Sequence, residues 1–167
     1  MSFLQQVNSA KPNYGLDVLE NLAEQRGWLL ERLSNGDMMM ESVGEWCTYA
    51  IQFTWSAEYQ SLHITCSLDM HLPEDKGAQI NDLLATINSK IWIGHFAVMA
   101  GTNAPAFRHT VMMLGNDKAK SLEIAEIVET GLGECERFYP AFQFAAFNNM
   151  SAQQAMDSCL FECVGTA

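Results

Sequence analysis

Residues 46–55 (WCTYAIQFTW) and residues 62–72 (LHITCSLDMHL) decide the fold class of this chain. The odd-numbered positions of the first stretch are apolar, as are the even-numbered positions of the second, and mostly polar residues alternate with them. Alternation with a period of two predicts strands that bury one face and leave the other wet. Because parallel sheets are covered on both faces and lose this alternation, the pattern predicts an antiparallel sheet with helices packed on one face.

Two hairpins are predicted to flank these strands. The runs 28–33 and 38–43 are compatible with strands and enclose an Asn-Gly pair, which is a strong signal for a tight turn. The runs 96–100 and 107–114 enclose a short segment with Gly, Asn and Pro, which predicts the second hairpin.

Apolar residues at helical spacing predict one helix before the first hairpin and another before the second. The first helix begins at Leu16 and ends at Gly27, a residue type that favours helix termination. The second helix opens at Pro73, and acidic residues in its first turn complement the helix dipole. We expect Gly94 to end this second helix.

A third helix is predicted from Lys118 onward. Pro140 must kink or break it, because proline lacks an N–H and its ring crowds the preceding turn. The residues of this helix that we expect to face inward are Leu122, Ala125, Ile127, Val128, Leu132, Cys135 and Phe138. Residues 151–154 (SAQQ) fit a capping box, which predicts a last short helix to about Glu162.

The resulting element order, α-ββββ-α-ββ-α(α), predicts a single α+β domain, because no internal repeat or low-complexity linker divides the chain. We assign residues 1–15 to an N-terminal arm, residues 16–149 to the domain, and residues 150–167 to a C-terminal short helix and tail.

The charge of the chain argues against two classes of partner. Nine Lys and Arg against twenty Asp and Glu give a net charge of -11, which repels nucleic acids and anionic lipids. No apolar run approaches the roughly 20 residues that cross a bilayer, and the first residues do not form a secretory signal. We therefore expect a cytoplasmic protein that binds neither nucleic acid nor membrane. Its five scattered cysteines are odd in number, so we expect reduced thiols.

The candidate catalytic and metal-binding groups do not form a recognisable site. His63 and His71 are eight residues apart on a predicted strand, roughly 26 Å, so they cannot bind one metal ion. Asp69 and His71 are neighbours on one face, but such pairs are usually solvated ion pairs. Cys159 and Cys163 provide only half of a structural zinc site. We predict no catalytic residue, no metal site and no cofactor.

Two further features have both a structural and a functional interpretation. His95 follows the predicted end of a helix, where we expect its ring to bond a terminal carbonyl. The ten methionines are flexible core filling in one interpretation and an adaptable surface for a protein partner in the other.

Five motifs occur in order along residues 16–147. They are Leu68-Asp69-Met70-His71-Leu72-Pro73, Leu83-Leu84 to Ile87-Asn88, Trp92-Ile93-Gly94-His95-Phe96, Phe107-Arg108-His109, and Cys135-Glu136-Arg137-Phe138-Tyr139-Pro140-Ala141-Phe142. Together they resemble the YbjN family of bacterial sensory transduction regulators. The resemblance implies a fold similar to that of type III secretion chaperones, with a curved antiparallel sheet, flanking helices and commonly a homodimer.

The resemblance also implies a regulatory or chaperone-like role through protein contacts, with no catalytic residue to carry over. The positions that match the family pattern, and that we treat as fold or interface candidates, are Asn88, Trp92, Gly94, His95, Phe96, Arg108, Glu136, Tyr139 and Pro140.

We therefore expect a non-enzymatic bacterial regulator that binds a protein partner as a homodimer. The alternative is a small-molecule sensor or small enzyme with a pocket between helices and sheet. Its functional groups would be residues such as Asp69, His71, His95 or Arg108.

Overall fold

The computed structural model describes residues 13–114 and 117–164. Six strands form one antiparallel sheet in the order β1-β2-β3-β4-β6-β5, with four α-helices in the described residues, so the predicted α+β class and element order are confirmed. The elements are α1 (Tyr14–Arg26), β1 (Glu31–Arg32), β2 (Met38–Val43), β3 (Thr48–Ser56), β4 (Ser61–Ser67), η3 (Glu74–Lys76), α2 (Gly77–Asn88), β5 (His95–Val98), β6 (Pro105–Met112), α3 (Asp117–Phe147) and α4 (Ala152–Val164). Residues 1–12, most of the predicted N-terminal arm, lie outside the described residues.

The burial of β3 and β4 follows the alternation in the sequence. Tyr49, Ile51 and Phe53 of β3 are buried, and so is every even-numbered residue from 62 to 72. The strand β4 nevertheless ends at residue 67, earlier than predicted. Beyond it the chain bonds the first residue of β6 and the loop before that strand: Leu68 N donates to the carbonyl oxygen of Pro105, and Leu72 N to that of Asn103, both at 3.0 Å.

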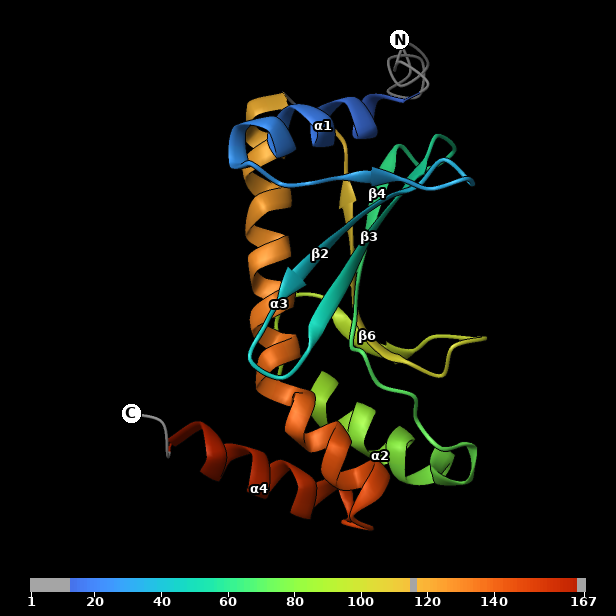
Figure 1. The fold of residues 1–167 in the computed structure, drawn as a ribbon, viewed down its shortest axis with the longest axis vertical. Helices are drawn as coiled ribbons and strands as arrows, with labels where there is room; N and C mark the ends of the chain where they lie inside the picture. The colour runs from blue at the N-terminus through green and yellow to red at the C-terminus, as the bar shows by residue number, and fades with distance from the viewer. Residues whose placement is uncertain (1–12, 115–116, 165–167) are drawn as a thin grey trace, which may run out of the picture.

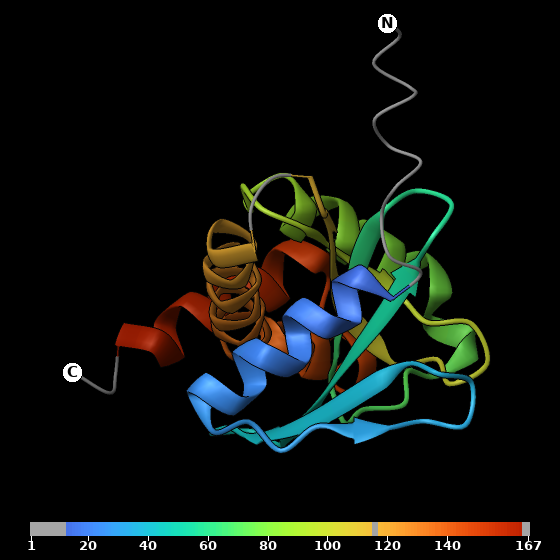
Figure 2. The ribbon, with the colours of Figure 1, turned by 90° about the horizontal axis from the view of Figure 1, so that it is seen from above.

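Helices cover one face of the sheet. Figures 1 and 2 show α1 and α3 against the same face, and we call the opposite face the outer face. An aromatic cluster joins the sheet to α3, because Phe96 on β5 contacts Phe107 on β6 and both Phe138 and Phe142 on α3. The ring centroids lie 5.8, 5.9 and 5.5 Å from that of Phe96, which makes this phenylalanine the centre of the core at the β5 edge.

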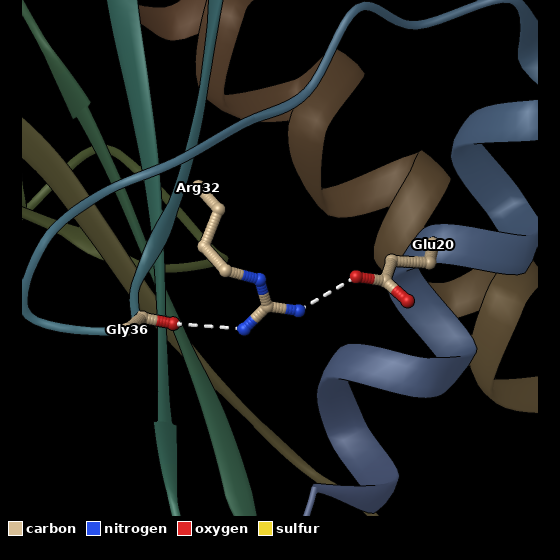
Figure 3. A network of polar contacts seen from close by, with 3 residues as sticks. All are labelled: Glu20, Arg32 and Gly36. Atoms are coloured by element: carbon tan, nitrogen blue, oxygen red, sulfur yellow. Dashed lines mark hydrogen bonds and ion pairs between the residues drawn. The ribbon is translucent and has the colours of Figure 1, made fainter.

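Two exposed ion pairs link α1 to its neighbours. Arg26 lies 3.3 Å from Glu129 on α3, and Arg32 on β1 lies 2.7 Å from Glu20. Figure 3 shows the guanidinium of Arg32 between Glu20 and the carbonyl oxygen of Gly36, which it reaches at 3.5 Å. Exposed pairs contribute about 0 to 1 kcal/mol each, so the two pairs orient α1 against α3 and the β1–β2 hairpin more than they stabilise the fold.

The strand β1 is short, and this leaves part of β2 with a single neighbour. Glu31 and Arg32 pair with Met39 and Met38, whereas residues 40–43 of β2 pair with β3 alone. The hairpin turn itself follows the predicted Asn-Gly signal, with Gly36 at a φ of 92°.

The predicted helix ends are right for α1 and wrong for α2. Gly27 ends α1 in the left-handed conformation, with a φ of 72°. The helix α2 follows a short 3-10 turn after Pro73 and ends at Asn88, six residues before Gly94. The reason is that the side chain of Asn88 bonds the backbone of β5, which directs the chain out of the helix before Gly94 is reached.

The long helix α3 differs from its prediction in two respects, the effect of Pro140 and the direction of Leu122. It is continuous through Pro140, so this residue does not break it, and Figure 1 shows the ribbon changing direction in its C-terminal part. Leu122, expected to face inward, is 58% exposed. The buried stripe runs through Ile124, Val128 and Cys135, and at 100° per residue Leu122 lies on nearly the opposite side.

The predicted capping box before α4 is confirmed. The backbone N–H of Gln154 donates to Ser151 Oγ at 3.3 Å, and the N–H of Ser151 donates to Gln154 Oε1 at 2.9 Å. The helix buries Ala155, Met156 and Cys159 in the common core. Among the described helices, none combines the length and the apolar character needed to cross a bilayer.

Candidate interaction surface on the outer face

One row of side chains crosses the whole outer face. The register of the five strand pairs places Glu31, Met39, Gln52, Thr65, Arg108 and His95 opposite one another from β1 to β5. Because side chains alternate between faces, every member of this row points to the face opposite the core residues Met40, Phe53 and Phe107. The row begins with a carboxylate at one sheet edge and ends with an arginine and a histidine at the other.

The basic end of the outer face consists of His63, His95 and Arg108, and Arg108 carries its fixed positive charge. Arg108 is half-buried and donates from Nε and Nη2 to Nε2 of His63, at 3.1 and 2.9 Å. Since Nε2 accepts, His63 is neutral and carries its proton on Nδ1, which lies 2.7 Å from Thr110 Oγ1. Burial and the nearby Arg108 charge lower the pKa of His63, in keeping with a neutral ring.

His95 lies directly opposite Arg108 across the β5–β6 pair. It is exposed, and in the described residues it makes no hydrogen bond to a helix-end carbonyl, so that expectation is wrong. The cause is the early end of α2, which leaves His95 as the first residue of a strand rather than the neighbour of a helix terminus.

The acidic end of the outer face consists of Glu31, Asp37 and Glu41. Oδ2 of Asp37 accepts hydrogen bonds from Gln52 Nε2 at 2.7 Å and from Thr54 Oγ1 at 2.8 Å, which fixes this carboxylate over β3. Glu31 and Glu41 are exposed on β1 and β2. The outer face is therefore negative at the β1–β2 end and positive at the β6–β5 end.

The Trp92 loop, residues 89–94, connects α2 to β5 and is held at its C-terminal end by two contacts. The side chain of Asn88 bonds both polar groups of the Phe96 backbone, donating to O at 3.0 Å and accepting from N at 2.7 Å. Gly94 has a φ of 73°, and a Cβ there would lie 2.3 Å from the Phe107 ring. The loop presents Trp92 with 99% of its surface exposed.

A separate group of predicted residues lies on α3 and holds the β2–β3 turn. Glu136 Oε1 accepts the backbone N–H of Glu45 at 2.6 Å. The ring of Tyr139 stacks on that of Trp46, with centroids 6.0 Å apart and planes 4° from parallel. Pro140 is buried in the same stretch of helix. These contacts position the turn against α3.

The nine family-pattern residues therefore fall into two structural groups. Six of them, Asn88, Trp92, Gly94, His95, Phe96 and Arg108, surround the β5–β6 hairpin. Three, Glu136, Tyr139 and Pro140, lie in α3. The prediction overlooked His63 as the direct partner of Arg108 and Asp37 as the fixed carboxylate. The sequence alternation indicated which face of each strand is polar. It did not indicate that β4 pairs with β6, which brings His63 to Arg108.

The groups named for a small-molecule site do not come together around one cavity. His71 Nδ1 lies 2.7 Å from the carbonyl oxygen of Thr102. Arg108 and His95 lie on the outer face. A cavity of about 590 Å³ between α1 and α3 is lined by residues such as Val18, Gln25, Lys118 and Leu122 and by none of these groups.

Three of the four described thiols are buried, and Cys47 is half-buried near Asp69 and Glu136. Cys66, Cys135 and Cys159 are buried, and burial raises the pKa of the Cys135 thiol well above its usual value, which keeps it protonated. In residues 13–114 and 117–164, no group of three or more His, Cys, Asp or Glu is arranged to hold a metal ion. The side chain of Cys163 lies outside the described ones.

Comparison with known proteins agrees with the resemblance of the motifs. A family model, YbjN, described as "Putative bacterial sensory transduction regulator", matches residues 15–144. No curated protein matches the chain. The match includes nearly all of α1, the whole sheet, α2 and nearly all of α3. Because it spans well over half of the 167 residues, the chain belongs to the YbjN family.

Proposed function

We propose that this chain is a cytoplasmic regulator that acts by binding another polypeptide as a homodimer, in the manner of a chaperone, and not by catalysis. The description of the family as regulators of sensory transduction supports the regulatory part. The scatter of the acid, base and thiol groups over separate surfaces favours binding over chemistry.

The observation that carries this proposal is the exposure of Trp92 in a braced loop. Leaving a large apolar side chain in water forgoes about 1.5 to 3 kcal/mol of burial, and Trp and Arg dominate the binding energy of protein interfaces. Trp92 is 99% exposed and the adjacent Ile93 is 42% exposed. The loop ends two residues before Phe96, whose backbone is held by the two hydrogen bonds from the Asn88 side chain. A rigid loop loses little conformational entropy when its tryptophan is buried by a partner.

A photo-crosslinking experiment in cells tests this function. A benzophenone side chain replaces Trp92 in one variant and Tyr59, a distant aromatic residue that is 65% exposed, in a control variant. We expect irradiation to link the position-92 variant to a defined polypeptide, with a mass above the 18.6 kDa of the single chain, and to leave the position-59 variant unlinked. Equal or absent crosslinking at the two positions would refute the proposal.

Self-association is a separate part of the same proposal. Light scattering on a sizing column reports whether the chain has the mass of one or two copies at micromolar concentration. A single-copy mass would remove the homodimer and leave the partner contact at Trp92 to be judged by crosslinking.

A further inference from the structure

We propose that the homodimer forms through the outer face, with the β1–β2 end of one protomer lying over the β6–β5 end of its partner. This inference rests on the homodimer of the proposed function and goes beyond it, because it names the surface and commits to a second copy of this chain as the occupant.

The distribution of charge on the outer face is self-complementary. A two-fold axis parallel to the strands and lying between β3 and β4 exchanges the two edges of a six-stranded sheet. It brings Glu31 of one protomer toward His95 of the other, and the β2 strand with Glu41 toward the β6 strand with Arg108. It also brings Asp37, fixed over β3, toward His63 on β4. All three acidic groups therefore meet the basic end, where Arg108 carries the positive charge and the two histidines offer ring nitrogens.

Arg108 bonds a histidine ring, whereas four other basic residues of the chain form ion pairs with glutamates. Arg26, Arg32, Lys120 and Arg137 each form an ion pair with a glutamate. Within the described residues Arg108 has no carboxylate in ion-pairing distance, and its bonds go to the neutral ring of His63. His63 occupies Nε and one donor of Nη2, which leaves the Nη1 side of the guanidinium for an acceptor outside the protomer.

The centre of the outer face is compatible with close packing of two sheets. Between the charged ends, the partly exposed positions of the outer face include Ala50, Ser67 and Ala97, all with small side chains, whereas Ala106 beside them is fully buried. The strands cover roughly 600 Å² in projection, from the spacing of about 4.8 Å between strands and 3.3 Å between residues. Because side chains make the surface uneven, the accessible area of this face is larger than its projected area and approaches the roughly 800 Å² per partner of a standard interface.

The net charge selects the orientation of the two copies. Each protomer carries -11, so two copies repel one another unless positive groups are placed against negative ones. Stacking the copies with like ends together would place Glu31, Asp37 and Glu41 against their own counterparts. The reversed orientation is the arrangement that avoids this contact.

Charge reversal with rescue tests the inference. The variants are Arg108→Glu, the double variant Glu31→Arg with Glu41→Arg, and the combination of all three changes. Glu31 and Glu41 are exposed and take part in no ion pair of the described structure, so the double variant should fold even if Arg108→Glu does not. Lys118→Glu, an equal change of charge at an exposed site on α3, away from the outer face and the Trp92 loop, is the matched control.

Light scattering on a sizing column gives the mass of each variant over a range of concentrations. We expect the wild-type chain and Lys118→Glu to be dimers, the dissociation constants of the Arg108→Glu and double variants to rise at least about tenfold, and the triple variant to recover the dimer. A wild-type dimer that survives the double variant, or a triple variant that stays monomeric, would overturn this interface while leaving the Trp92 contact intact. A monomeric wild-type chain would overturn the homodimer as well.

Discussion

The side-chain amide of Asn88 bonds both backbone polar groups of Phe96, at 3.0 Å to its oxygen and 2.7 Å from its nitrogen, and so occupies the place of a neighbouring strand. Two matched hydrogen bonds at a half-buried site join the end of α2 to the edge of the sheet. We expect Asn88→Ala to lower the free energy of unfolding by about 1 to 3 kcal/mol, because it leaves both groups of Phe96 without a partner. Urea unfolding measures this change, and Asn81→Ala on the exposed side of α2 should have little effect.

Gly94 and Gly101 form a natural pair for separating backbone strain from steric conflict. Both have positive φ angles, of 73° and 89°, but a Cβ at Gly94 would lie 2.3 Å from the Phe107 ring and 2.8 Å from the Arg108 carbonyl oxygen, whereas a Cβ at Gly101 meets nothing within 4 Å. We expect Gly101→Ala to cost about 1 kcal/mol of stability and Gly94→Ala about 2 to 4 kcal/mol. Equal thermal stabilities of the two variants would contradict this prediction.

Trp92 and Phe96 are four residues apart and should respond to truncation in opposite ways. Trp92→Ala removes an exposed side chain, so the free energy of unfolding should stay within about 0.5 kcal/mol of the wild type. Phe96→Ala removes the centre of the aromatic cluster and should cost about 3 to 5 kcal/mol. Chemical denaturation of both variants checks this. A strongly destabilised Trp92→Ala would show that the tryptophan serves the fold.

The neutral state of His63 makes stability depend on pH. Burial and the Arg108 charge lower the pKa of His63 in the folded chain, so the unfolded chain binds a proton more readily. Above the unfolded-state value of about 6.5 neither state is protonated; as the pH falls below it toward the folded-state pKa, the free energy of unfolding decreases. His63→Gln should therefore reduce the loss of stability between pH 7.5 and pH 5.5, measured by urea unfolding.

His109 provides the control for the pH experiment. Burial also lowers its pKa, while the charge of Glu123 acts in the opposite direction. We expect His109→Gln to remove a separate share of the pH dependence and the double variant to remove both. An unchanged slope in His63→Gln would mean that folding does not lower the pKa of this ring.

Glu136 should be important for the position of the β2–β3 turn. Its carboxylate accepts the N–H of Glu45, and a second atom of the same carboxylate is buried. Glu136→Ala should lower the free energy of unfolding by about 1 to 3 kcal/mol and increase amide exchange at Glu45. Glu126→Ala on the exposed side of α3 is the matched control. Unaltered exchange at Glu45 would contradict the assigned role.

Features that depend on local periodicity could be predicted from the sequence. The alternation around Phe53 and Ile64 specified which face of each strand is buried, and the Ser151–Gln154 capping box specified the start of α4, because both signals lie within a few residues. The end of α2 could not be predicted in the same way. It depends on the bond between Asn88 and Phe96, and this bond requires β5 to be in place.

The outer face was predictable only in part, for the same reason. Polar residues on alternating positions indicated a wet face, and the family resemblance singled out Arg108 and His95. The contact of Arg108 with His63 depends on the pairing of β4 with β6, strands separated along the chain by α2 and β5. Leu122 shows a related limit within one helix, because its apolar side chain lies on nearly the opposite side of α3 from the buried stripe, and apolar type alone does not tell which side meets the sheet.

The two-residue length of β1 has a consequence for colloidal behaviour. Residues 40–43 of β2 pair with no second strand, and a strand margin of this kind can recruit further chains into fibrous aggregates. Glu41 is the only charged side chain on that four-residue stretch, so it acts as a gatekeeper against growth of this kind. Glu41, which faces a second copy in the proposed dimer, would therefore also oppose the addition of further chains at the edge of β2.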